Sequence, residues 1–461
     1  MNPTRTETDS LGPRLVPADA VYGVQTTRSI ENFPFTHARL PLEIIRGMAI
    51  LKLAAARTNA RLGQLPKEKE EAIAQACEEV LSGTYDDEFP LPVYQAGSGT
   101  SSHMNLNEVL AHLANETLGG KRGDKAPVHP NDDVNRGQST NNMFPSGAKV
   151  ALILQLPALV DALSILTTAL LRKADEFSSI LKSGRTHLQD AVPVTLGQEF
   201  GAWAHAVSRQ IPSIEKAADR LRELGAGGNA VGTGVNTKPT FRAELVQALN
   251  EATGEMFRPA TNGIHLTQFM TDFASFSAAL RSAALDVQQV ANNLRLLASG
   301  PNTGIGEIRL PAVEPGSSIM PGKINPSICE AVNMACIQIQ GLDAAVAMAC
   351  GAGQLELNTH MPLIGTNVLR AAQWLTEAAR VLAEKCIAGI TADVEACRRH
   401  LENSAGLPTL LNPRLGYDQV AQLVKEALAE GRTLHQVAVE KGLLTEAEYD
   451  ALIASSTGPN L

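Results

Sequence analysis

Residues 264–299 read IHLTQFMTDFASFSAALRSAALDVQQVANNLRLLAS, a run of 36 residues without glycine or proline that ends at Gly300. Its apolar residues recur alternately three and four positions apart, which is the a/d stripe of a helix that packs against other helices. The stripe consists of Leu266, Phe269, Phe273, Phe276, Leu280, Ala283, Val287, Val290, Leu294 and Leu297. The pattern predicts one uninterrupted helix about 54 Å long. A compact domain rarely buries so long a rod, so the helix needs several neighbours, some of them from other copies of the chain.

Four more segments have the same helical periodicity and exceed the usual length of a helix in a globular protein. They are residues 147–181, 196–224, 326–349 and 362–388. Together with residues 264–299 they predict a central bundle of long helices in residues 137–394. A mixed N-terminal domain is expected in residues 1–136, and a small helical C-terminal domain in residues 395–461. A monomeric coiled-coil rod is the alternative, but structured, glycine-rich loops join the rods and argue against it.

The composition is that of an ordinary folded protein. Hydrophobic residues make up 44% of the 461 residues and charged residues 19%, which argues against disorder. The formal net charge of −9 gives no electrostatic basis for binding nucleic acid or an anionic membrane. The N-terminus resembles neither a signal peptide nor a transit peptide, so a cytoplasmic location is expected. The most apolar stretch, Ala151–Val160, contains Gln155 and Pro157, and no transmembrane helix is expected.

The cysteines and histidines are not spaced as metal ligands usually are. The six cysteines form no CxxC pair, and the ten histidines form no HExxH motif. Neither a zinc site nor an iron–sulfur cluster is therefore expected. The cysteines are interpreted as small buried hydrophobic residues in a reducing compartment.

Four polar, glycine-rich segments interrupt the helical patterns, and loops at the ends of long rods are where function is expected. Residues 97–108 (GSGTSSHMNLNE) and 129–142 (HPNDDVNRGQSTNN) are dense in hydroxyl and amide groups that can donate to a carboxylate. A capped helix start is the alternative for the first segment, and a solvated loop for the second. Burying so many polar groups is costly unless a polar ligand satisfies them.

Residues 184–190 (GRTHLQD) and 314–330 (EPGSSIMPGKINPSICE) complete the set. His187 is of the type best suited to proton transfer near neutral pH, although a single histidine is more often structural. Lys323 offers a compact positive charge for a carboxylate. Either Ser317 or Ser318 is able to transfer a proton if backbone donors lower its pKa. A mobile loop is the alternative for this last segment.

The sequence GSSIMPGKINP at residues 316–326 resembles the signature loop of the aspartase/fumarase superfamily. The other three polar segments resemble the remaining active-site regions of that superfamily in the expected order, and the similarity covers essentially the whole chain. The resemblance implies a mainly α, three-domain subunit whose long helices form the core of a homotetramer. It also implies active sites shared by three subunits, and catalysis without a metal or an organic cofactor.

The resemblance further implies roles for individual residues. Ser317 is implied to be the base that abstracts the C3 proton of a dicarboxylate, and fixed donors stabilise the resulting aci-carboxylate. His187 and Glu330 are implied to pair and to help activate water. The residues implied to bind the substrate are Ser98, Thr100, Ser139, Thr140, Asn141, Thr186, Lys323 and Asn325. A possible second anion site is implied at His129, Asn131 and Asp132.

Class II fumarases give the better match within the superfamily, so the implied reaction is the reversible hydration of fumarate to L-malate. This preference rests on segments outside the signature loop, such as residues 304–308 (GIGEI) and 416–418 (GYD). Ser101, Thr140 and residues 352–355 look more like an aspartate ammonia-lyase. Release of ammonia from aspartate is therefore the alternative, together with a lyase for a related substituted dicarboxylate.

Three positions depart from both families. His103 stands where Asn is usual, Asn142 where Asp is usual, and Asn229 where Thr is usual. Two of them lie in active-site segments, so they leave the identity of the substrate open. A catalytically silent family member is a further hypothesis, but such a protein is expected to lack Ser317, Lys323 or His187, and all three are present.

Overall fold

The computed structural model describes residues 3–315, 319–320 and 322–457. Within those residues the fold is mainly helical, and its strands form short two-stranded pairs. The chain divides into two compact units. Unit 1 comprises Met1–Leu159, Pro212–Arg281 and Gln338–Trp374, and unit 2 comprises Val160–Ile211, Ser282–Ile337 and Leu375–Leu461. The three-domain division expected from the sequence stays a prediction.

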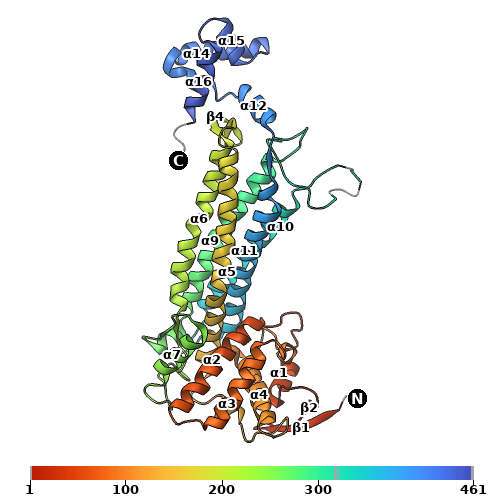
Figure 1. The fold of residues 1–461 in the computed structure, drawn as a ribbon, viewed down its shortest axis with the longest axis vertical. Coiled ribbons are helices and arrows are strands. Elements are labelled where there is room, and N and C mark those ends of the chain that lie inside the picture. Colours follow the sequence, from red (N-terminus) through yellow and green to blue (C-terminus); the bar gives the residue numbers. More distant parts are fainter. Residues whose placement is uncertain (1–2, 316–318, 321, 458–461) are drawn as a thin grey trace. The chain divides into compact units, whose positions relative to one another are not determined.

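Long helices dominate the chain, as Figure 1 shows. They are α5 (Thr140–Glu176), α6 (Leu196–Leu221), α9 (Thr271–Leu297), α10 (Ser327–Cys350) and α11 (Met361–Lys385). In unit 1, the hydroxyl of Ser277 on α9 donates to Asp343 on α10 at 2.7 Å. In unit 2, Gln210 on α6 donates to Asp286 on α9 at 2.6 Å. The helices therefore pack against one another in each unit, and the prediction of a bundle of long helices is confirmed.

The expectation of one unbroken helix over residues 264–299 is wrong. The chain forms α8 (Gly263–Gln268), then leaves the helical conformation at Phe269, with φ −103° and ψ 130°, before α9 begins. Carbonyl groups at the break accept hydrogen bonds from a distant segment: Thr267 O from the backbone N–H of Asn358, and Met270 O from the thiol of Cys350. The spacing of apolar residues indicates only which side chains are buried, so it could not reveal these long-range hydrogen bonds.

Unit 1 also contains the shorter elements of the N-terminal half, in which α2 packs against α3 and α7, and α4 packs against α1 and α3. The helices are α1 (Val24–Asn32), α2 (Leu42–Arg61), α3 (Lys67–Leu81), α4 (Thr100–Thr117) and α7 (Phe241–Thr253). The strand pairs are β1 (Thr4–Asp9) with β2 (Gly12–Pro17), and β5 (Glu223–Leu224) with β6 (Arg258–Pro259). Proline precedes both α2 and α3, and acidic residues in their first turns favour the positive ends of the helix dipoles.

Unit 2 contains a β-hairpin and the C-terminal helices. The hairpin is β3 (Leu181–Thr186) with β4 (Gln189–Thr195), and β7 (Ile308–Arg309) pairs with β8 (Thr391–Ala392). The helices that follow are α12 (Val394–Glu402), α13 (Pro408–Leu415), α14 (Tyr417–Glu430), α15 (Leu434–Glu440) and α16 (Glu446–Ser456). α12 packs against β3 and α16 packs against β4, so C-terminal residues support both strands of the hairpin.

Two helices, α5 and α10, are long and apolar enough to cross a membrane by length and composition alone. No transmembrane helix was expected from the sequence. The core helix of a soluble protein passes the same test, and α5 carries a buried Lys149 that pairs with Asp272 at 3.0 Å. Only 33% of the apolar window of α10 is buried within this chain, so much of that helix is left uncovered.

The cysteines are all free, as the sequence predicts. Five are buried and Cys350 is half-buried. The thiols of Cys329 and Cys386 lie 3.6 Å apart. Among the residues that the structure describes, no group of three or more His, Cys, Asp and Glu side chains is arranged to hold a metal ion.

Candidate active site

The first polar segment forms a tight turn directly before α4. Ser98 and Gly99 have φ values of +61° and +87°, and a Cβ on Gly99 would lie 2.2 Å from the ring of Phe144. Only glycine fits at that position, because the ring leaves no room for a side chain. Ser98 is buried, and its Oγ lies 3.4 Å from Oγ1 of Thr100. The turn therefore places two of the predicted donors at the N-terminus of a helix, where the dipole favours an anion.

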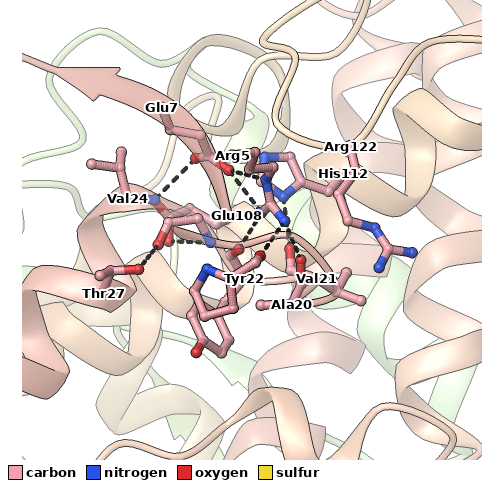
Figure 2. Close-up of polar contacts among 12 residues, drawn as sticks. Arg5, Glu7, Ala20, Val21, Tyr22, Val24, Thr27, Glu108, His112 and Arg122 are labelled. Carbon is pink, nitrogen blue, oxygen red and sulfur yellow. Dashed lines mark hydrogen bonds and ion pairs between the residues drawn. The ribbon is translucent and has the colours of Figure 1, made fainter. Parts of the chain in front are cut away.

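The N-terminal segment fixes α4 in place, as Figure 2 shows. The buried carboxylate of Glu108 accepts hydrogen bonds from the backbone N–H groups of Gly23, Gln25 and Thr26 at 2.8 to 3.1 Å. Burial raises the pKa of Glu108 although these bonds oppose the shift. One turn further along α4, the ring of His112 donates from Nδ1 to the carbonyl of Val21 at 2.6 Å. These contacts hold the helix that carries the first polar segment.

Arg5 also makes several hydrogen bonds to the N-terminal segment that contacts α4, and Figure 2 shows them. Its guanidinium donates to the carbonyls of Ala20 at 2.7 Å and of Tyr22 at 2.8 Å, and it pairs with Glu7 at 2.7 Å. The other oxygen of the Glu7 carboxylate accepts from the backbone N–H of Val24. The loop between β2 and α1 is therefore tied to buried charges rather than left to solvent.

The second polar segment brings Ser139, Thr140 and Asn141 to the start of α5. Oγ of Ser139 accepts from the backbone N–H of Asn141 at 3.3 Å, and the Asn141 amide donates to the carbonyl of Ala230 at 2.7 Å. Thr140 Oγ1 lies 2.7 Å from Nδ1 of His103, a residue on α4. Together with the contact between Gly99 and Phe144, this bond places the N-termini of α4 and α5 side by side. Five predicted substrate-binding residues thus belong to one pair of helix starts in unit 1.

The two departures Asn142 and Asn229 have structural roles. The Asn142 amide donates to Oγ1 of Thr267 at 2.8 Å beneath the start of α5. Asn229 has a φ of +55°, a backbone conformation that asparagine tolerates better than threonine, and its amide donates to the carbonyl of Val235. Both side chains are buried.

The predicted second anion site lies on one turn of unit 1. His129 precedes a short π-helical turn, Pro130–Val134, and its Nδ1 accepts from the backbone N–H groups of Asn131 at 3.1 Å and Asp132 at 3.2 Å. The structure therefore brings the three residues together, with the imidazole acting as the cap of the turn. Their binding of an anion stays a prediction.

The third polar segment is the tip of the hairpin in unit 2. Thr186 pairs with Gln189, so His187 and Leu188 form a two-residue loop, with φ values of +55° and +58°. A loop with two positive φ values usually holds Asn-Gly. In the His-Leu sequence found here, each residue carries a conformational strain of about 1 kcal/mol. Strain of this kind is typical of functional sites. Thr186 and His187 are exposed, and within the described residues the imidazole of His187 has no hydrogen-bond partner.

A buried ionic network supports this hairpin, and it was not predicted from the sequence. The Glu307 carboxylate accepts from Arg185 at 2.7 and 3.1 Å, from Lys182 at 3.0 Å and from His400 Nδ1 at 2.9 Å. Lys182 also pairs with Glu199 at 2.8 Å. Burial raises the pKa of Glu307, but the hydrogen bond from Arg185 and the charge of Lys182 outweigh it, so the pKa is lowered. The GIGEI segment around Glu307 was the available signal, because a single charge stands there between glycines and isoleucines.

The fourth polar segment is described only in part. Ser317, the predicted base, lies outside the described residues. Lys323 is exposed, and its backbone N–H donates to the carbonyl of Met320 at 3.2 Å. Asn325 stands two residues before α10, and Glu330 lies in the first turn of that helix with its side chain 4.0 Å from Arg295. The pairing of Glu330 with His187 stays a prediction.

Comparisons with protein families agree with this picture along the chain. A family described as "Lyase" matches residues 12–341, and a family described as "Fumarase C C-terminus" matches residues 407–456. The chain is 46% identical over 448 residues to the class II fumarate hydratase of Thermosynechococcus vestitus, which covers 97% of this chain and 96% of that protein. It is 44% identical over 450 residues to the class II fumarate hydratase of Bacillus subtilis, with 97% of each covered.

Solved structures give the same result for the fold. The class II fumarase of Schistosoma mansoni superposes with a TM-score of 0.93 at 38% identity, and 98% of each chain is covered. The fumarate lyase:delta crystallin of Brucella melitensis bound to cobalt superposes with a TM-score of 0.96 at 43% identity, covering 99% of this chain and all of that one. Because near-complete coverage is combined with identities well above 30%, the chain belongs to the class II fumarate hydratase family of lyases.

Proposed function

We propose that this enzyme hydrates fumarate reversibly to L-malate, by anti addition through an aci-carboxylate intermediate. The observation that carries the proposal is the identity of 43 to 46% with class II fumarate hydratases over nearly the whole chain. The start of α4 and the start of α5 support it, because they gather hydroxyl and amide donors suited to the carboxylates of a dicarboxylate.

In the dehydration of malate, one group of residues removes the C3 proton and stabilises the resulting charge, and a second group protonates the departing hydroxide. Ser317 takes the proton from C3, and the electron pair moves into the adjacent carboxylate to form the aci-carboxylate. Lys323 and Asn325 hold that carboxylate as its negative charge grows. The C–O bond at C2 then breaks, and His187, oriented by Glu330, gives a proton to the departing hydroxide so that water leaves. Hydration of fumarate runs through the same steps in reverse.

We also propose that the enzyme assembles with copies of itself into a homotetramer whose active sites are shared. The support is an exposed face of α10 on which residues recur three and four positions apart, as in a helix packed against another. Its members are Ala331, Met334, Ile337, Gln338, Gly341, Ala344, Ala347 and Met348. Large apolar side chains on this face are well exposed in the single chain, at 66% for Met334, 57% for Ile337 and 76% for Met348. Burial against another copy removes this surface from water.

The expected location, cofactor requirement and pathway of the enzyme are based on its proposed reaction and its composition. We expect a cytoplasmic enzyme that needs neither a metal nor an organic cofactor. Its substrate and product belong to the tricarboxylic acid cycle, in which we expect it to work.

Absorbance of fumarate gives the direct test. The wild-type enzyme is incubated with malate and, separately, with aspartate, and we expect fumarate to form rapidly from malate alone. Fumarate formed from aspartate, with none from malate, would replace the hydratase by the ammonia-lyase. Ser317→Ala is expected to be nearly inactive in both directions but still to bind a dicarboxylate, because the base is lost and the donors remain.

Mixing two inactive variants tests the sharing of sites. Ser317→Ala and His187→Asn are denatured together, refolded and assayed, and part of the activity is expected to return, because some sites then combine an intact Ser317 with an intact His187. Each variant refolded alone is the control. A mixture with no more activity than the two controls would show that each site draws both residues from one chain.

A further inference from the structure

His103 is a fully buried side chain in the first turns of α4, at a position where the family resemblance leads one to expect asparagine. Its Nδ1 lies 2.7 Å from Oγ1 of Thr140, at the start of α5. Thr140 itself is only partly buried. The Thr140 hydroxyl therefore meets the imidazole, on a residue that is still partly exposed at the start of α5.

The imidazole of His103 is neutral in this setting. Burial lowers the pKa of this imidazole well below its ordinary value, and it likewise lowers the pKa of the neighbouring Lys52 well below its ordinary value. Lys52 is itself fully buried, and its Nζ donates to Oδ1 of Asn135 at 2.9 Å. A neutral imidazole has one N–H donor and one acceptor nitrogen, so the position of its single proton decides what the ring offers to Thr140.

The surroundings of Nε2 indicate where that proton lies. Nε2 of His103 is buried without a hydrogen-bond partner among the described residues. A proton on Nε2 would leave a buried N–H unpaired, which is rarer and more costly in proteins than an under-satisfied acceptor. A proton on Nδ1 is used, because Thr140 Oγ1 lies within hydrogen-bond distance. His112 on the same helix shows the same form, since its Nδ1 faces a carbonyl oxygen that can only accept.

The direction of this bond decides which part of the threonine hydroxyl faces a substrate. If Nδ1 donates, Oγ1 accepts, and the hydroxyl hydrogen is free to donate to an anion. If Nδ1 accepted instead, the hydroxyl would donate to the ring and present lone pairs to the anion, which would repel it. Donation by the ring also polarises the hydroxyl and strengthens the bond that it gives.

We infer that His103 is a positioning residue, which donates from Nδ1 to Thr140 and thereby turns the Thr140 hydroxyl hydrogen toward a carboxylate of the substrate. The inference rests on the proposed function, in which Thr140 binds that carboxylate. His103 does not touch the reacting atoms. It acts on binding, so its loss should weaken the ground state and the transition state alike and appear in KM rather than in kcat.

The two variants differ in whether they keep a hydrogen-bond donor near the Thr140 hydroxyl. His103→Asn puts an amide N–H close to the position of Nδ1, whereas His103→Leu removes the donor. We expect His103→Leu to raise KM for both malate and fumarate roughly tenfold or more, the scale of a hydrogen bond to a charged group, with kcat within about twofold of wild type. His103→Asn should return KM close to the wild-type value.

His112→Leu is the matched control, because it removes a buried histidine of the same helix that donates to the backbone carbonyl of Val21. It should lower stability, and KM should rise much less than in His103→Leu. Equal increases in KM for His103→Leu and His112→Leu would overturn the inference. If His103→Leu does not fold, His103→Gln takes its place, since its amide reaches toward Nε2 instead of Nδ1. A KM for His103→Gln equal to that of His103→Asn would overturn the inference as well.

A double-mutant cycle tests the coupling to Thr140. Thr140→Val should raise KM by itself, and adding His103→Leu should raise it little further, because the two residues act through one bond. If the increase in KM of the double variant equals the product of the increases in the two single variants, the inference is overturned. A wild-type enzyme inactive on malate would instead refute the proposed function, whereas an active wild type with unchanged KM in His103→Leu would refute only the role of His103.

Discussion

The guanidinium group of Arg185 donates to both oxygens of the buried Glu307 carboxylate, at 2.7 and 3.1 Å, and Thr186 and His187 follow Arg185 directly in the chain. This pair anchors β3 next to the tip of the hairpin, which carries two of the proposed site residues. Lys182 donates to the same carboxylate, which is out of contact with water, and it also pairs with Glu199.

Glu307→Gln should therefore both destabilise the protein and impair catalysis. The substitution removes the counter-charge of Arg185 and leaves Lys182 with Glu199 alone, which costs about 3–5 kcal/mol, and the loosened hairpin should lower kcat. Urea unfolding and steady-state kinetics measure the two effects. Glu395→Gln is the control, because it removes an exposed partner of Arg398 at 3.0 Å and should cost less than about 1 kcal/mol. Equal losses of stability in the two variants would contradict the role given to the network.

The stabilisation by Glu307 should depend on pH in a defined direction. Its folded pKa is lowered from the ordinary value of 4.5, so the ionised carboxylate contributes stability at a pH above about 4.5 and loses it as the pH falls through the folded pKa. The difference in free energy of unfolding between wild type and Glu307→Gln should be constant from about pH 7 to 5 and shrink below that range. A difference that stays the same down to about pH 3 would count against this titration.

The long helices could be predicted from the sequence because their signal is local. Residues 326–349 were expected to be helical, and α10 spans Ser327–Cys350. The same reasoning failed where distant groups decide the structure. The break at Phe269 depends on residues 350 and 358, and Glu307 meets Arg185 across more than 100 residues of chain. The hairpin at residues 181–195 was read as the end of a helix and a polar loop, because Lys182 and Arg185 gave it no alternating apolar pattern.

His187→Asn should separate activity from stability. The substitution removes the proposed proton-transfer group, so kcat is expected to fall about 10²-fold. Asparagine tolerates the positive φ of this position better than histidine, so thermal stability should be kept or slightly raised. Leu188→Asn, at the other residue of the same loop, should keep nearly wild-type kcat. A His187→Asn enzyme with more than about a third of the wild-type kcat would exclude this residue as the main acid or base.

Gly99→Ala should disrupt the site, whereas Gly119→Ala should be tolerated. Both glycines have positive φ values, +87° and +82°, so alanine is strained at each by the order of 1 kcal/mol. Only at Gly99 would the new Cβ meet the ring of Phe144, and around Gly119 it would meet nothing within 4 Å. We expect Gly99→Ala to cost at least about 2 kcal/mol more than Gly119→Ala and to raise KM. Similar melting temperatures and KM values for the two variants would refute the tight packing of this turn.

Removal of metal ions should leave the activity unchanged. The sequence has neither HExxH nor CxxC spacing, and within the described residues no three His, Cys, Asp and Glu side chains are grouped as ligands would be. Enzyme dialysed exhaustively against a chelator, and exposed to air, is expected to keep its full kcat on malate. Loss of activity that returns when one particular metal ion is added would show that a metal takes part in catalysis.

Ile337→Glu should dissociate the assembly, because it places a charge in the centre of the exposed apolar face of α10. Burying an unpaired carboxylate between copies is strongly unfavourable, whereas the same charge on the surface of a single chain costs little. Light scattering should therefore show a smaller species with an unchanged circular dichroism spectrum and little activity, since the shared sites are lost. Leu428→Glu is the matched control: Leu428 is 78% exposed on α14, away from the α10 face in sequence, and its replacement should leave both the mass and the activity of the wild type. A fully active monomeric Ile337→Glu enzyme would refute both the proposed assembly and the proposed sharing of sites.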